Sequence, residues 1–107
     1  MTGLGVLLGL DVGTSSTKAV VLREAGRVLA RATQEYPIDT PKPGWAEQDP
    51  EWWWQAVLST VRRVLREGGV RPQTVRGLSF SGQMHGTVVL GGDLRPLRPA
   101  IIWADQR

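Results

Sequence analysis

Cysteine is absent from this chain of 107 residues, and histidine, tyrosine and phenylalanine occur only once each. Without cysteine, the chain has no disulfide framework, no thiolate metal site and no thiol redox chemistry, which fits a reducing compartment. The hydrophobic content of 41% over this length supports one modest core. We therefore expect a single domain over residues 1–107.

Lysine is also scarce. Of the 13 lysine and arginine residues, only Lys18 and Lys42 are lysines, and the other residues are arginines. The formal net charge is +3, but the arginines are scattered, and the densest group is Arg62, Arg63 and Arg66. Binding to a nucleic-acid backbone normally needs a concentrated basic face. We therefore expect no nucleic-acid partner.

No apolar run in the chain is long enough to cross a bilayer. The apolar residues 1–10 lack the basic start and the small-residue cleavage site of a signal peptide. These absences predict a cytoplasmic protein without a membrane partner.

Apolar, β-branched segments at 6–10 and 19–22 flank a polar turn and predict two strands. Loose alternation over 27–36 predicts a third antiparallel strand, and 75–81 reads as a further strand. Extended segments within 87–103, with a glycine turn between them, predict a second hairpin-like element. Together with one helix, this order predicts an α/β fold.

The helix is predicted over residues 50–67, because Asp49 can cap it and Pro50 suits its first turn. Four prolines in 37–50 predict a loop before it, and the Gly68–Gly69 pair predicts its end. Apolar residues at steps of three and four predict a buried stripe made of Trp54, Val57, Leu58, Val61, Val64 and Leu65.

The polar segment between the first two strands is the first candidate site. Glycine allows backbone amides to converge on an anion, and hydroxyls add donors, so this turn suits a phosphate. Asp11, at a strand end, suits a hydrated Mg²⁺, held through water. A polar hairpin turn with a self-capping Asp11 is the alternative. The phosphate-binding candidates are Gly13, Thr14, Ser15, Ser16, Thr17 and Lys18.

The second candidate site is the run Gln83, Met84 and His85, which lies between two glycines that interrupt the extended pattern. A neutral imidazole offers one donor and one acceptor, which suits hydroxyl groups, and methionine offers an apolar wall. A structural role for the single histidine is the alternative. Trp45 has the same two readings, as a wall of a sugar pocket or as a core residue.

The segments carrying these sites resemble the FGGY carbohydrate kinase family. Residues 9–18 look like the first phosphate-binding hairpin of the actin-like ATPase superfamily, and residues 36–54 are similar to the segment after the third strand of FGGY kinases. The SGQMHG run at 81–86 matches the pattern of the xylulokinase branch. Residues 97–107 resemble a strand and loop that reach the sugar site. The four motifs stand in family order and span nearly the whole chain.

The resemblance implies a ribonuclease-H-like, actin-like fold: a mixed sheet with an N-terminal three-stranded antiparallel meander and a packed helix, incomplete here. It implies that residues 1–107 are the N-terminal part of a sugar-binding domain. It also implies ATP and Mg²⁺ as cofactors and phosphorylation of a ketopentose, D-xylulose in particular. The other partner is then the rest of the kinase chain, and a homodimer is left open.

In the family, Met84 and His85 would touch the sugar, with Gln83 beside them, and Trp103 would reach the same site. Asp105 and Arg107 would bind sugar hydroxyls or pair with each other, and the sequence leaves both alternatives open. The family's kinases are several times longer, and their catalytic base follows this segment. The chain alone is therefore expected to be inactive. Another sugar or polyol kinase, or a non-enzymatic regulator on the same fold, is the alternative.

Overall fold

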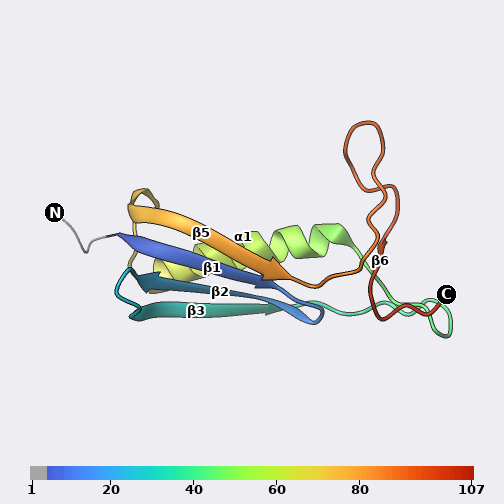
Figure 1. The fold of residues 1–107 in the computed structure, drawn as a ribbon, viewed down its shortest axis with the longest axis horizontal. Coiled ribbons are helices and arrows are strands. Elements are labelled where there is room, and N and C mark those ends of the chain that lie inside the picture. The colour runs from blue at the N-terminus through green and yellow to red at the C-terminus, as the bar shows by residue number, and fades with distance from the viewer. Residues whose placement is uncertain (1–4) are drawn as a thin grey trace.

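The N-terminal three-stranded meander and one later strand form a single mixed sheet. The computed structural model describes residues 5–107, so residues 1–4 of the predicted domain lie outside the described part. The strands are β1 (Val6–Val12), β2 (Ser16–Arg23), β3 (Val28–Glu35) and β5 (Val75–Gly82), in the order β3-β2-β1-β5 (Figure 1). β5 pairs in parallel with β1, whereas the other neighbours are antiparallel. The predicted mixed sheet is confirmed.

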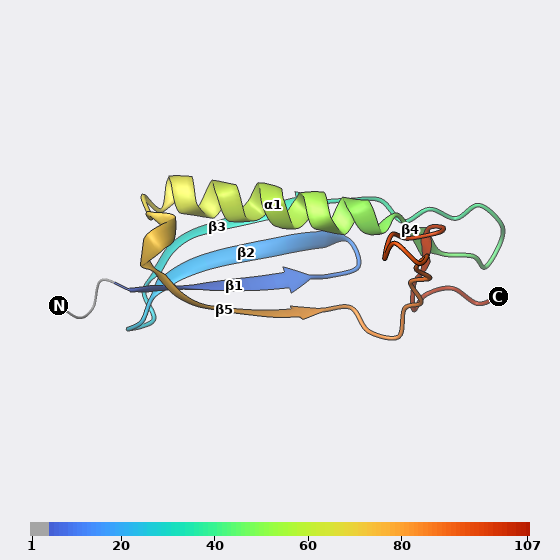
Figure 2. The ribbon, with the colours of Figure 1, turned by 90° about the horizontal axis from the view of Figure 1, so that it is seen from above.

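One face of this sheet is covered by the helix α1 (Pro50–Glu67), which lies along β2 and β3 (Figure 2). The side chains between sheet and helix form the core, and they alternate along each strand as the period of two requires. The buried members are Val6, Leu8, Ala19, Val21, Ala32 and Val64.

The bounds of α1 agree with the prediction, for the predicted reasons. The Asp49 side chain accepts a hydrogen bond of 2.9 Å from the Glu51 amide, and Pro50 occupies the first turn. The chain then leaves the helix through Gly69, whose φ of +63° favours glycine.

The predicted buried stripe of α1 was only partly right. Val64 is fully buried, but Trp54 is 55% exposed, and the buried positions also include Ala56 and Thr60. Small residues bring the helix close to the sheet at these positions, and the Thr60 hydroxyl bonds back to the Ala56 carbonyl at 2.8 Å. The large indole of Trp54 is therefore left on the outer side of the helix. Within residues 5–107, no helix has both the length and the apolar character of a membrane span.

The two long loop segments, 37–49 and 83–107, lie at one end of the molecule, beyond the ends of β1 and β5 (Figure 1). The proline-rich 37–50 segment was predicted as a loop, but it contains the short strand β4 (Glu47–Gln48), which pairs with β6 (Ala100–Ile101). Two residues free of proline are enough for this pairing. Single bridges join Thr87 to Ile101 and Leu90 to Pro96, as the predicted hairpin-like element requires. A short 3₁₀ turn (Pro72–Thr74) leads into β5.

Candidate functional site

The predicted sites meet at the carboxyl ends of β1 and β5. Because these two strands are parallel neighbours, Val12 lies opposite Gly82, and the segments that follow them leave the sheet at the same edge (Figure 2). Carboxyl ends of parallel strands are the usual place for ligands in α/β sheets. The β1–β2 turn and the 83–86 loop therefore face the same region.

The β1–β2 turn is held in shape by Tyr36. The Gly13 amide donates to the Ser16 carbonyl at 2.9 Å, and the Tyr36 hydroxyl donates to the Gly13 carbonyl at 2.6 Å. That hydroxyl also lies 3.1 Å from the hydroxyl of Thr17. Burial raises the pKa of Tyr36, with smaller effects from Thr17, which lowers it, and from Asp11, which raises it. The tyrosine therefore stays neutral and keeps its proton for these bonds.

The predicted phosphate-binding residues divide between two faces. The hydroxyl of the fully buried Thr17 lies against Tyr36 on the fold side of the turn, and Ser16 is buried as well, at 9% exposure. Ser15 is exposed and Thr14 is half-buried at the tip. The turn thus presents Thr14 and Ser15 outward, whereas the amide and the carbonyl of Gly13 are both bonded within the fold. Contact of any of these residues with phosphate stays a prediction.

Asp11 and Lys18 lie opposite each other on the sheet face that α1 does not cover, and both are exposed. Ser81 of β5 flanks Asp11 on its other side, and its hydroxyl donates to the Asp11 carboxylate at 3.3 Å. Within residues 5–107 no three acidic, histidine or cysteine side chains group as a metal site. A single exposed carboxylate suits an ion that keeps its water shell, so Asp11 fits a water-bridged Mg²⁺.

The 83–86 loop starts with a sharp departure from the sheet. A side chain at Gly82 would place its Cβ 3.0 Å from the Val12 carbonyl oxygen, so glycine lets the strands stay close up to this point. The Gln83 amide then donates to that same carbonyl at 2.9 Å. His85 has a φ of +64°, which is uncommon for a residue with a side chain and is found where a loop is tightly constrained.

Met84 and His85 are exposed and line an open cavity of about 680 Å³. Its lining also includes Trp53 of α1 and apolar residues from β1, β5 and the C-terminal segment. The single histidine is therefore not a core residue. Its contact with sugar stays a prediction.

Trp103 is brought to the β1–β2 turn from the end of the chain. Its indole Nε1 donates to the Thr14 hydroxyl at 2.8 Å, while 57% of the residue remains exposed. This contact joins a predicted sugar-site residue to a predicted phosphate-site residue, 89 positions apart. Contact of Trp103 with a sugar stays a prediction.

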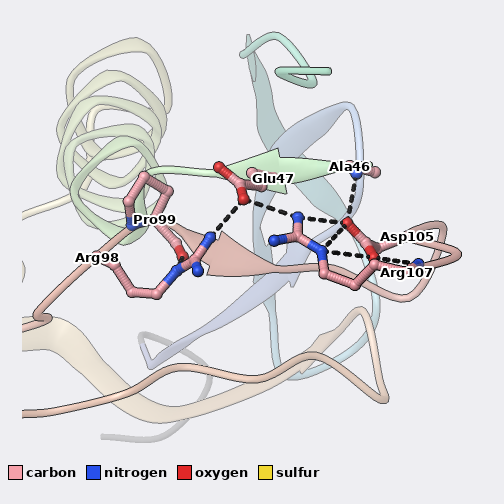
Figure 3. Close-up of polar contacts among 6 residues, drawn as sticks. All are labelled: Ala46, Glu47, Arg98, Pro99, Asp105 and Arg107. Atoms are coloured by element: carbon pink, nitrogen blue, oxygen red, sulfur yellow. Dashed lines mark hydrogen bonds and ion pairs between the residues drawn. The ribbon is translucent and has the colours of Figure 1, made fainter. Parts of the chain in front are cut away.

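Asp105 and Arg107 pair with each other, which was one of the two alternatives. The Arg107 guanidinium donates to the Asp105 carboxylate at 2.5 and 2.9 Å, and the Ala46 amide donates to it at 2.7 Å (Figure 3). The hydrogen bond from Arg107 is the main reason that the pKa of Asp105 lies far below its usual range. Their contact with a sugar stays a prediction.

Glu47 of β4 connects this pair to Arg98 and was missed as a site residue. Its side chain is 7% exposed, and its carboxylate bonds to Arg98 and, at 2.7 Å, to Arg107 (Figure 3). The guanidinium of Arg107 also stacks on Trp45 at 3.7 Å. Trp45 is therefore a half-buried stacking platform and not a core residue. No sequence signal links Glu47 to arginines 51 and 60 positions away.

Comparison with known proteins supports the resemblance. The sequence model of one protein family, the N-terminal domain of the FGGY family of carbohydrate kinases, matches residues 6–107. The xylulose kinase of Lactococcus lactis is 45% identical over 94% of this chain and 20% of its own length. A glycerol kinase of Polaromonas is 41% identical with the same coverage. The crystal structure of xylulose kinase from Rhodospirillum rubrum superposes with a TM-score of 0.86 and 31% identity, over 95% of this chain and 21% of that one. The chain thus spans about a fifth of the length of these relatives.

Proposed function

The chain belongs to the FGGY family of carbohydrate kinases, and on that premise we propose that it is the N-terminal part of an ATP-dependent kinase for D-xylulose. Residues 1–107 are then part of the domain that binds the sugar. The observation that carries the proposal is the meeting of two segments at one sheet edge. The β1–β2 turn, suited to phosphate, lies beside the loop that presents Met84 and His85 to an open cavity.

In the proposed reaction, the 5-hydroxyl oxygen of the sugar bonds to the γ-phosphorus of ATP. The bond from that phosphorus to the bridging oxygen breaks, ADP leaves, and the hydroxyl proton passes to a base supplied by the rest of the protein. Such transfer depends mainly on positioning and on neutralisation of charge. Mg²⁺, when bound, would offset the phosphate charge.

Different residues of this chain would bind the phosphates, the metal and the sugar. Thr14 and Ser15 at the tip of the β1–β2 turn and the exposed Lys18 would bind phosphate oxygens, and Asp11 would orient the water shell of the metal. His85 would bond to sugar hydroxyls and Met84 would contact its carbon face. Trp103 would close the sugar site from the side of the turn.

The choice of xylulose rests on the SGQMHG run at 81–86 and on xylulose kinases among the similar proteins. A glycerol kinase at 41% identity makes a polyol the second candidate. A regulator that binds sugar or ATP without turnover is a third. It would share the fold but would have no base to accept the proton.

A substrate panel on the protein encoded by the complete reading frame tests the proposal. ADP release would be followed with ATP and D-xylulose, ribulose, gluconate, fuculose and glycerol. We expect the highest kcat/KM with D-xylulose and no turnover by residues 1–107 alone. A higher kcat/KM with glycerol than with D-xylulose would identify glycerol as the substrate. If no acceptor is phosphorylated although sugar binding is measurable, the result would favour the regulator.

A further inference from the structure

Among residues 5–107, Gln48 is the largest of the fully buried side chains, although its amide is polar. A buried amide without partners would be costly, so its hydrogen bonds carry information. The side chain lies in β4, next to Glu47 but outside the ion-pair cluster, which consists of Glu47, Arg98, Asp105 and Arg107. Gln48 does not itself line the open cavity, although it bonds to two residues that do, Trp53 and Gln83.

All four hydrogen-bonding positions of this amide are used. Nε2 donates to the carbonyls of Thr14 at 2.6 Å and Pro37 at 3.0 Å. Oε1 accepts from Trp53 Nε1 and from Gln83 Nε2, both at 2.9 Å. An amide has two donors and two lone pairs on its oxygen, so the Gln48 side chain is saturated.

The chemistry of the partners determines which way the amide points. An indole N–H can only donate and a backbone carbonyl can only accept, so Oε1 must face Trp53 and Nε2 must face Thr14 and Pro37. Gln83 must then present its Nε2 to Gln48, which leaves its Oε1 toward the Thr14 hydroxyl, 3.4 Å away. One buried amide therefore determines the orientation of a second, partly exposed one.

These bonds join the two segments of the proposed active site. Thr14 lies at the tip of the β1–β2 turn, and Gln83 directly precedes Met84 and His85. The Thr14 hydroxyl also accepts from Trp103. We propose that Gln48 is a positioning residue of the kinase, which holds the phosphate-binding turn and the sugar-binding loop in one relative position without touching either substrate.

This inference rests on the proposed function and deepens it. A phosphoryl transfer needs the sugar hydroxyl and the γ-phosphate in line, and a misplacement of about 1 Å can cost about a hundredfold in rate. The hydrogen bonds of a saturated amide are directional, so they resist such a shift more than non-directional apolar packing does. Replacing Gln48 by methionine keeps the length of the side chain and removes all four bonds.

The test compares Gln48→Met, Gln83→Met and the double variant in the complete protein, with Gln55→Met as the matched control. Gln55 is exposed on α1 and bonds only to Glu51 among the described contacts. Per folded molecule, we expect Gln48→Met to lower kcat/KM for the sugar about ten- to a hundredfold. The double variant should lose less than the product of the two single losses, because both changes remove the contact between the two amides. The control should stay within about twofold of the unchanged protein.

A purely structural role would give a different pattern: a lower Tm with unchanged kcat/KM per folded molecule. That result, or losses that multiply in the double variant, would overturn the inference. If Gln48→Met does not fold, Trp53→Phe removes one of the four bonds and should show a smaller loss with the same lack of additivity toward Gln83→Met. An unchanged kcat/KM in Trp53→Phe would then overturn it.

Amide hydrogen exchange separates this inference from the proposed function. The Gly13 and Gln83 amides bond to the Ser16 and Val12 carbonyls and report on the turn and on the loop. Gln48→Met should speed exchange at both and leave the paired β1 and β2 amides unchanged, with or without kinase activity. A protein without any sugar kinase activity would refute the proposed function alone, and uniform or unchanged exchange would refute the positioning role.

Discussion

Removal of the Tyr36 hydroxyl should destabilise the chain by an amount that its contacts define. The hydroxyl bonds to the Gly13 carbonyl and to the fully buried Thr17 hydroxyl. In Tyr36→Phe the ring still fills its space, but the two partners lose their contact. Leaving buried partners unpaired costs about 1–3 kcal/mol in the free energy of unfolding. For a domain of this size, each kcal/mol lowers Tm by about 4–8 °C.

The pH dependence gives a second, independent check. Burial raises the pKa of Tyr36 above its ordinary value of 10.0. The folded state therefore holds the proton more tightly than the unfolded state does. The stabilising effect is complete below the unfolded pKa of about 10 and is lost as the pH rises through the folded pKa. The stability gap between the unchanged chain and Tyr36→Phe should consequently narrow above about pH 10.

Because Tyr36 is the only tyrosine, the ultraviolet absorbance of tyrosinate reports its ionisation directly. Urea unfolding at several pH values would give the free energies, and Thr40→Val, which removes an exposed hydroxyl, serves as the control. We expect little change in the control. A Tyr36→Phe variant as stable as the unchanged chain, or a tyrosine that titrates below pH 10 in the folded chain, would refute the reasoning.

Three further predictions concern the complete protein and the ion-pair cluster. Asp11→Ala should lower kcat about a hundredfold with little change in sugar affinity, because the lost contact is with metal and phosphate. Steady-state kinetics would test this, and an unchanged kcat would mean that Asp11 only caps the turn. His85→Ala should weaken sugar binding about ten- to a hundredfold in calorimetry with an unchanged Tm, whereas a lower Tm with normal affinity would contradict the ligand role. Arg107 lowers the pKa of Asp105, so this pair stabilises the chain above the unfolded pKa of about 3.9, and the effect is lost as the pH falls toward the folded pKa. Asp105→Asn should therefore flatten the acid limb of the stability curve, and an unaltered acid limb would show that the pair contributes nothing.

Local features of the sequence were sufficient for most of the fold. The alternation in the first three strands, the cap at Asp49 and the glycines after Glu67 each act within a few residues, so they could be read along the chain. The same holds for the β1–β2 turn and the 83–86 loop, whose residue types indicated their chemistry. Their meeting at one sheet edge followed from the parallel pairing of β1 and β5, which the structure shows.

Only the tertiary structure decided which polar residues hold the site together. Gln48 reaches Gln83 across 35 positions and Glu47 reaches Arg98 across 51, and no local period marks such pairs. The exposure of Trp54 has the same origin, since the sheet and not the helix selects the buried face. Hydrogen bonds and burial between distant segments depend on how the elements pack. The sequence by itself therefore determined the elements, the family and the candidate residues, while packing determined the orientation of the side chains that support them.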